Sequence, residues 1–105
     1  EASTLSNQIE TVPNTFTLNQ NYPNPFNPST NISYSISNGE HVSINIFDVN
    51  GGKVIEIFND YRPAGTYTID WNGENERGLQ VSAGVYLYSI EAGEFRQAKK
   101  MILLK

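Results

Sequence analysis

Period-2 alternation of apolar and polar side chains is the feature that most constrains this sequence. From Ile32 to Ile36 every second residue is apolar and the residues between them are serines, as a strand with one buried face requires. The same alternation returns in residues 42–46 and 67–71, and residues 84–90 are rich in β-branched and aromatic side chains. No stretch of useful length shows the 3.6-residue apolar period of an amphipathic helix. The sequence therefore predicts an all-β fold.

Turn signals separate these segments roughly every 8 to 12 residues. Asn38-Gly39 favours a type I′ hairpin turn and Asn50-Gly51-Gly52 favours a second hairpin, so we expect residues 32–58 to form a three-stranded meander. Residues 59–65 contain a proline and two small residues, and we expect them to form a longer connection.

The remaining turn and the two ends of the chain complete the predicted domain. Ala92-Gly93-Glu94 leads into a final strand from about Phe95 to Leu104, and residues 16–18 favour a short edge strand. About seven short strands with such turns are typical of an immunoglobulin-like antiparallel β-sandwich. We therefore predict a sandwich domain over residues 16–105, and a flexible linker over residues 1–15, which show no sustained period.

A proline-rich segment, Tyr22 to Thr30, precedes the first clear strand. It holds three of the five prolines of the chain. Each proline removes a backbone donor and restrains the residue before it, so the segment can be neither a helix nor a central strand. Pro25-Phe26-Asn27-Pro28 matches the minimal polyproline ligand pattern but lacks a flanking basic residue. We expect Tyr22 and Phe26 to cover an open end or edge of the sandwich instead.

Charge is distributed unevenly along the chain. Residues 1–94 hold all eleven acidic residues against three basic ones, a net charge of −8, whereas residues 95–105 hold four basic residues and no acid. The acidic body argues against nucleic-acid binding, which needs a cationic face. The basic, apolar run Lys99 to Lys105 has two interpretations that the sequence leaves open, a solvated strand edge or a recognition element.

Two further absences limit the class of protein. Cysteine is absent, which excludes disulfides, thiolate metal sites and thiol nucleophiles. The apolar run Met101 to Leu104 is far shorter than the ~20 residues of a membrane span. The sequence begins at Glu1 rather than at methionine, so we expect a domain excised or processed from a longer protein, with any targeting segment upstream.

Candidate chemistry is sparse. The only histidine, His41, has no marked acidic partner for a hydrolase triad, and nothing distinguishes a catalytic pair among the acids. Asp70 to Glu76 presents oxygens at alternate positions as calcium loops do, but Asn75 replaces the glycine and Val81 the bidentate glutamate of that pattern. A solvated turn is the simpler interpretation. We expect no enzyme activity, catalytic residue, cofactor or metal site.

Aromatic side chains permit another class of function. Exposed tyrosines such as Tyr61, Tyr86 or Tyr88 would give a carbohydrate-binding or adhesive accessory module, in which the rings stack on sugars. A structural spacer that stabilises a neighbouring domain is a third possibility. Trp71, in contrast, is most simply a core residue.

Several motifs, taken in order, resemble the type A C-terminal sorting domain of proteins that the type IX (Por) secretion system of Bacteroidetes exports. The resemblance covers roughly Phe16 to Lys105 and includes a small departure at Gly51-Gly52, where the family often has a bulky residue before glycine. The opening signature is Leu18 to Thr30, which contains Tyr22, Pro23, Asn24, Pro25, Phe26, Asn27 and Pro28. The hairpin motif is Asp48 to Val54, and the central motif consists of Ala64 to Tyr67 and Trp71 to Gly73. The last two motifs are Ser82 to Tyr86, which contains Gly84 and Tyr86, and the closing motif Lys99 to Lys105.

The resemblance implies a non-catalytic secretion signal. A parent protein would cross the inner membrane, fold in the periplasm, and present this domain to the outer-membrane type IX machinery. A sortase-like surface peptidase would then commonly remove the domain, leaving the cargo at the cell surface or outside the cell. The implied partners are that machinery, its peptidase and a covalently fused upstream cargo. Residues 1–15 would contain or follow the cleavage region.

We place translocon recognition on the closing motif. The lysines would supply its electrostatic part and the exposed apolar residues the rest, with only about half of the side chains facing outward because strands alternate. The candidate recognition residues are Lys99, Lys100, Met101, Ile102, Leu103, Leu104 and Lys105.

Overall fold

The computed structural model describes residues 13–105, and it confirms the all-β prediction for them. Its seven strands are β1 (Thr17–Leu18), β2 (Thr30–Ile36), β3 (Glu40–Asp48), β4 (Lys53–Arg62), β5 (Gly65–Trp71), β6 (Gly84–Ala92) and β7 (Phe95–Leu103). In this part of the chain there is no helix that could cross a membrane. Of the expected linker, residues 1–12 lie outside the described residues, and residues 13–15 precede β1.

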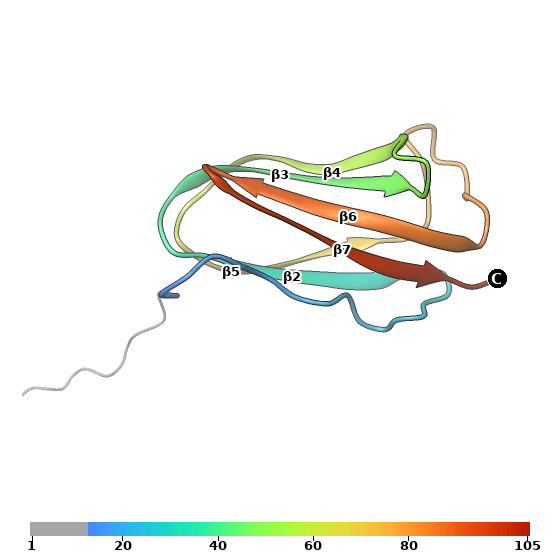
Figure 1. The fold of residues 1–105 in the computed structure, drawn as a ribbon, viewed down its shortest axis with the longest axis horizontal. Helices are drawn as coiled ribbons and strands as arrows, with labels where there is room; N and C mark the ends of the chain where they lie inside the picture. Colours follow the sequence, from blue (N-terminus) through green and yellow to red (C-terminus); the bar gives the residue numbers. More distant parts are fainter. Residues whose placement is uncertain (1–12) are drawn as a thin grey trace, which may run out of the picture.

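Two antiparallel sheets face each other as a sandwich (Figure 1). The smaller sheet has the order β1-β2-β5 and the larger the order β4-β3-β6-β7. This is an immunoglobulin-like arrangement in which the fourth strand joins the sheet of the third, sixth and seventh, whereas in constant-type domains it joins the other sheet. The predicted sandwich is therefore confirmed.

The predicted meander across residues 32–58 is wrong in its first half. β2 pairs with β1 and β5, whereas β3 pairs with β4 and β6, so residues 37–39 cross from one sheet to the other. Gly39 does not have the positive φ of a type I′ turn. Gly39 instead leaves room for the Tyr61 ring, whose hydroxyl occupies the space of a β-carbon at that position.

The hairpin predicted at Asn50-Gly51-Gly52 is confirmed and joins β3 to β4. The Asp48 carboxylate accepts hydrogen bonds from the amides of Asn50 and Gly52, each at 2.9 Å, and Gly51 has a φ of 87°. A left-handed residue flanked by a carboxylate acceptor is a stable way to reverse the chain. The turn at Gly93 is likewise confirmed, because β6 and β7 pair up to Ala92 and Phe95.

The expected connection over residues 59–65 is shorter than predicted. β4 continues to Arg62, which pairs with Glu40 of β3, so only two residues separate β4 from β5. The Arg62 guanidinium lies 4.3 Å from the centre of the Phe58 ring and 4.5 Å from that of Tyr67. Pairing with β3 and these cation–π contacts explain why polar residues at the end of β4 remain in the strand.

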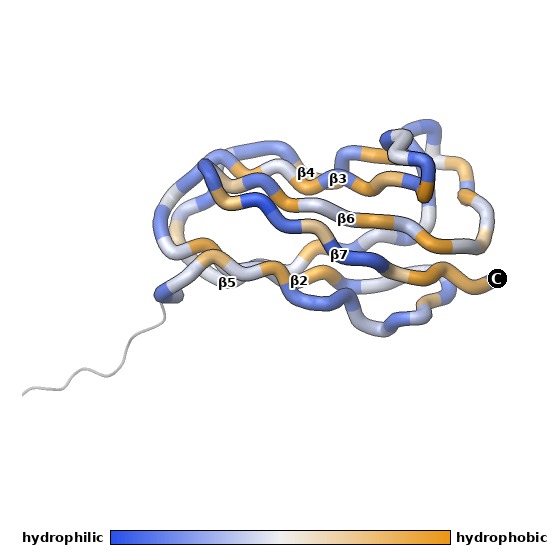
Figure 2. Tube along the Cα trace, viewed as in Figure 1, coloured by the Kyte–Doolittle hydropathy of each residue, from blue (hydrophilic) through white to orange (hydrophobic). Residues whose placement is uncertain are grey.

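Alternate side chains of both sheets meet between them to form the core. Along the strands, hydrophobic and hydrophilic positions follow each other in turn (Figure 2). Trp71 is buried, as predicted, and its indole N–H donates to the carbonyl of Glu74 at 2.9 Å. The other large, fully buried side chains are Tyr34, Tyr88, Phe26, Ile32, Ile36, Ile44, Ile46, Ile90, Met101, Leu103 and Val42.

Candidate docking surface around the last strand

β7 lies at the edge of the larger sheet and pairs with β6 along its whole length. Met101 and Leu103 are fully buried, whereas Lys100 is exposed and Ile102 half-buried. Lys99 is half-buried on the interior side, and beyond the strand Leu104 and Lys105 are exposed. As the alternation predicts, the strand divides between core and surface, and only part of the closing motif is accessible to a partner.

The proline-rich segment covers the outer edge of β7 (Figure 1). The Phe26 amide donates to the Ile102 carbonyl at 2.9 Å, and the Leu104 amide donates to the Phe26 carbonyl at 2.8 Å. The Asn24 side-chain oxygen accepts from the Ile102 amide at 3.0 Å, and the Gln20 side-chain amide donates to the Lys100 carbonyl at 2.8 Å. The two most distant motifs of the domain are therefore joined by backbone hydrogen bonds, and the outer edge of β7 is covered from the Lys100 carbonyl to the Leu104 amide.

Phe26 is the buried residue of the proline-rich segment. Its exposed fraction is 1%, and its ring centre lies 5.7 Å from that of Trp71. The prediction that Phe26 covers the sandwich is confirmed. The prediction for Tyr22 is wrong, because its side chain is 78% exposed. The Tyr22 backbone pairs with Asn31 at the start of β2, and this pairing leaves the ring in solvent. Three cis peptide bonds precede Pro23, Pro25 and Pro28.

A buried hydrogen-bond network holds the start of this segment. The Tyr88 hydroxyl donates to the Asn19 carbonyl at 2.7 Å and accepts from the Asn21 amide at 2.8 Å. Asn21, itself buried, donates through its side chain to the Thr30 hydroxyl at 2.9 Å and to the Pro23 carbonyl at 3.2 Å. Burial raises the pKa of the Tyr88 phenol. This network fixes the direction in which the chain leaves β1.

Gly84 and Tyr86, the other signature residues, also have structural roles. Gly84 begins β6 with a φ of 151°, a backbone conformation that residues other than glycine rarely adopt. The Tyr86 ring packs edge-on against Trp71 at 5.5 Å, and its hydroxyl donates to the Ser82 carbonyl at 2.6 Å. Burial raises the pKa of Tyr86, and the Asp48 charge adds to that effect. The signature residues Gly84 and Tyr86 therefore help to close the sandwich.

The structure does not favour the sugar-binding alternative. Tyr86 and Tyr88 are buried and cannot stack on a sugar ring, so the expectation that they are exposed is wrong. Only Tyr61 of the three suggested tyrosines is exposed, at 61%.

The loop after β5 is held by its own hydrogen bonds. The Asn75 side-chain oxygen accepts from the amides of Arg77 and Leu79, at 2.9 and 3.1 Å, and the Gln80 side chain donates to the Asn72 carbonyl. Asn75, which stands where the calcium pattern has glycine, is thus bonded within a turn, and Asp70, the first of the suggested ligands, accepts a hydrogen bond from the Asn31 side chain. Among residues 13–105, no three histidine, cysteine or acidic side chains gather where they could hold a metal ion.

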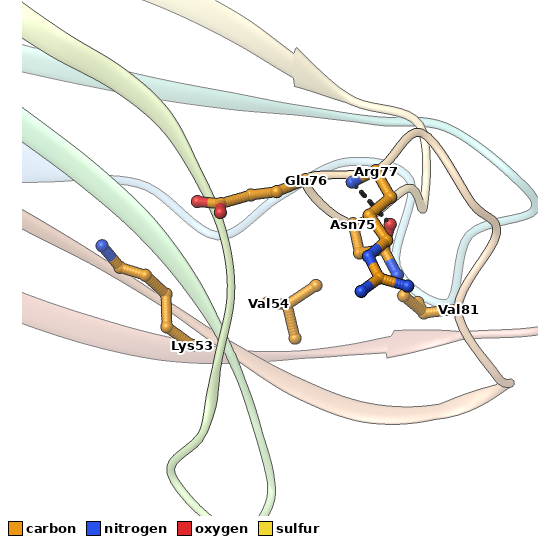
Figure 3. A pocket seen from close by; sticks show the side chains of 6 residues that line it. All are labelled: Lys53, Val54, Asn75, Glu76, Arg77 and Val81. Carbon is orange, nitrogen blue, oxygen red and sulfur yellow. Dashed lines mark hydrogen bonds between the residues drawn. The ribbon is translucent and has the colours of Figure 1, made fainter.

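A hollow of about 380 Å³ lies between this loop and the start of β4. Its walls carry Lys53, Val54, Asn75, Glu76, Arg77 and Val81. Figure 3 shows its charged side chains spread around the hollow rather than directed at one point. It is wide open to solvent and has no arrangement of a nucleophile with a base.

The bonds between the proline-rich segment and β7 have no local signal in the sequence. The Asn24 side chain and the Ile102 amide lie 78 residues apart. Each segment shows only that it is extended, and no local pattern says which strand an extended segment accompanies. Only a comparison of whole domains could have indicated the contact.

Comparisons with known proteins agree with this fold. Residues 20–104 match the sequence model of the family described as the secretion system C-terminal sorting domain. No match was found among curated proteins. Of solved structures, latent dimeric PorU from Porphyromonas gingivalis is similar with a TM-score of 0.65 and 22% identity over 81% of this chain. PorZ, an essential surface component of the type-IX secretion system of that bacterium, is similar with a TM-score of 0.52 and 17% identity over 86% of this chain.

The chain corresponds to only 9% of the PorU chain and 11% of the PorZ chain. At these identities the two structures show a shared fold. The family match is of a different kind, because it extends from the proline-rich segment through β7 and so includes both regions that the hydrogen bonds join. This protein belongs to the family of secretion system C-terminal sorting domains.

Proposed function

We propose that this domain is a non-catalytic secretion signal that directs a fused upstream cargo protein to the outer-membrane type IX translocon. The match of residues 20–104 to the sorting-domain family carries the proposal. PorZ, a surface component of the type-IX system, shares the fold over part of its length and supports the same assignment. The cargo then reaches the cell surface or the extracellular space. A sortase-like surface peptidase removes the domain in the region before β1.

Recognition uses the accessible part of the closing motif. Lys100 and Lys105 are exposed cations next to the apolar side chains of Ile102 and Leu104. The body before them has a net charge of −8, so this end is the region that an acidic partner would meet favourably. Buried Met101 and Leu103 hold the strand in place, and half-buried Lys99 contributes less than the two exposed lysines.

The test is export of a reporter. A periplasmic reporter with an inner-membrane signal is fused ahead of the full chain and produced in a bacterium with a working type IX system, and in a matched strain without its translocon. We expect the reporter at the surface or in the medium only in the competent strain. A reporter that stays in the periplasm of the competent strain, while the domain is folded and protease-resistant, would overturn the proposal.

Removing residues 99–105 is a poor test of recognition, because it also removes Met101 and Leu103 from the core. The double substitution Lys100→Glu and Lys105→Glu leaves the core intact and reverses the charge. Arg77→Glu, in the loop after β5, is the control, because it reverses one exposed charge elsewhere. We expect the double variant to retain reporter in the periplasm and the control to export it normally.

A further inference from the structure

The outer face of the larger sheet is divided into two halves of different chemistry. Directly paired residues of neighbouring strands point to the same face, so the pairings define rows across the sheet. One row contains Lys53, Phe47, Leu87 and Lys100, and the next contains Val85 and Ile102. We call these two rows the apolar half. The other rows form the polar half, which contains Ser43, Asn45, Glu56, Asn59, Glu91 and Arg96.

Most side chains of the polar half contact one another. Glu91 and Arg96 form an ion pair at 2.9 Å. Asn45 donates to the Ser43 hydroxyl at 3.0 Å, and Asn59 donates to Glu56 at 3.2 Å. Each of these side chains has at least one partner within the sheet, although the Asn45 side-chain oxygen is buried without one, so a docking protein would have to break such contacts or leave the polar half solvated.

The apolar half is exposed and has no such internal partners. Val85 and Leu87 are 37% and 36% exposed, and Val49, in the adjoining hairpin, is 65% exposed. Among residues 13–105 the ion pair of Arg96 is the only one, so neither Lys53 nor Lys100 is in an ion pair within that part of the chain. In Figure 2 this end of the sheet, near the label C, shows more hydrophobic colour on β6 and β7 than the other end. A cluster of exposed apolar side chains flanked by free charges is typical of a docking surface.

We propose that the apolar half docks onto an acidic protein surface of the export machinery that has an apolar centre. The inference rests on the proposed function and makes its recognition site specific. The only ionisable side chains in the two rows are Lys53 and Lys100, so carboxylates on the partner would be complementary on both sides of the apolar centre. The site then includes residues of β3, β4 and β6 in addition to the closing motif.

A second copy of this chain fits the apolar half less well. A two-fold contact places the same patch on both subunits, and each patch offers only lysines as charges. The lysines of one copy would then meet a patch without a carboxylate. A partner with its own acidic residues avoids this cost, and the fused reporter described above can test it.

The experiment compares both halves of the outer face. The double variant Val85→Thr and Leu87→Gln makes the apolar half polar while it nearly keeps side-chain volume. Ser89→Gln, on the same strand and face but in the polar half, where Ser89 pairs with Asn45, is the matched control. A third variant, Lys53→Glu and Lys100→Glu, tests the charge of the partner. Each chain is purified first, and only variants that melt within a few degrees of the unmodified chain are used.

We expect the apolar variant to export at least about tenfold less reporter than the unmodified chain, because loss of a central contact typically weakens binding by that factor. The charge variant should fall similarly, and Ser89→Gln should export normally. Export of both double variants at the unmodified level would overturn the inference and leave the proposed function in place. Failure of the unmodified chain would instead overturn the proposed function.

Two measurements on the purified chain test whether the apolar half binds a second copy of the chain or a membrane instead. Sedimentation gives the oligomeric state, and a dimer that the Val85→Thr and Leu87→Gln variant dissociates would mean that the apolar half binds a second copy. Pelleting with anionic phospholipid vesicles, lost in the Lys53→Glu and Lys100→Glu variant, would mean that it binds a membrane. Either result would overturn the inference, and a monomer without vesicle binding supports it.

Discussion

The two edge strands of the larger sheet, β7 and β4, are protected in different ways. The outer edge of β7 over residues 100–104 is covered by the proline-rich segment through backbone and side-chain hydrogen bonds. Among residues 13–105 no strand lies on the outer side of β4, and the pairing of β4 with β3 shifts register twice, leaving Val54 and Ile57 without paired residues. Such bulges twist an edge and make it a poor template for another strand.

The difference shows that one edge depends on long-range contact and the other on local irregularity. The β4 edge needs only its own residues and those of β3. The β7 edge needs residues about 80 positions upstream, together with Phe26 in the core. Damage to the proline-rich segment should therefore weaken the whole domain, whereas substitutions on the outer side of β4 should have small effects.

The largest expected effect is that of Phe26→Ala. Truncating a fully buried phenylalanine leaves a cavity next to Trp71 and should lower the free energy of unfolding by about 3–5 kcal/mol. Chemical denaturation of the purified chain measures this loss. Tyr22→Ala, in the same segment but exposed, should change stability by less than about 0.5 kcal/mol. Equal losses in the two variants would show that the segment does not close the core through Phe26.

A smaller loss is expected for Tyr88→Phe. The substitution keeps the ring but removes the hydroxyl, so the Asn21 amide and the Asn19 carbonyl lose their partner. Leaving such buried groups unpaired should lower the free energy of unfolding by about 1–3 kcal/mol. Tyr61→Phe, at the exposed end of β4, is the matched control. Stability of Tyr88→Phe at the level of the control would argue against the anchoring network.

Asn24→Ala removes one hydrogen bond from the covered edge. Its oxygen accepts from the Ile102 amide near the surface, where water can replace it in part, so the expected loss is about 0.5–1.5 kcal/mol. Asn59→Ala on β4 removes a solvent-exposed side-chain contact and should cost less. Thermal unfolding of the two variants, measured side by side, shows which substitution lowers stability more. A larger loss for Asn59→Ala than for Asn24→Ala would contradict the conclusion that the β7 edge depends more on its side-chain contacts than the β4 edge does.

High pH should loosen the domain gradually. Burial raises the pKa of Tyr34, Tyr86 and Tyr88 above the ordinary tyrosine value of 10.0. The unfolded chain therefore loses these protons first, so the contribution of these tyrosines to stability is constant below about pH 10 and is lost as the pH rises through the folded-state pKa values. Melting temperatures measured from pH 8 to pH 11 test the sign, and a rise in stability above pH 10 would contradict it. Tyr88→Phe should show a weaker fall.

Local sequence predicted the strands better than their arrangement. Alternation correctly located the strand at Ile32 to Ile36, and it predicted that about half of the closing motif would face inward, but it did not identify Met101 and Leu103 as the buried residues. It failed at Asn38-Gly39, because a short link between strands looks the same whether it makes a hairpin or crosses between sheets. It also could not tell that Phe26 points inward while Tyr22 points outward, since that depends on which backbone each one meets.

The same limit applies to the candidate docking surface. The closing motif marked Lys100 and Ile102, but their neighbours across the sheet come from β3, β4 and β6. The sequence placed Leu87 in a strand and left Phe47 just beyond the alternating run 42–46, and it paired neither residue with a neighbour, because register across several strands is fixed only by the folded sheet. A surface assembled from four strands therefore has no continuous signature in the sequence.

The position of Met101 and Leu103 has a consequence for synthesis. They belong to the last strand in chain order, so the core lacks two of its members until the ribosome has made everything upstream. A chain whose translation stops before β7 would have an open sandwich in which the Phe26 backbone has no strand to pair with. The sandwich can therefore close only after the chain has been made through Leu103.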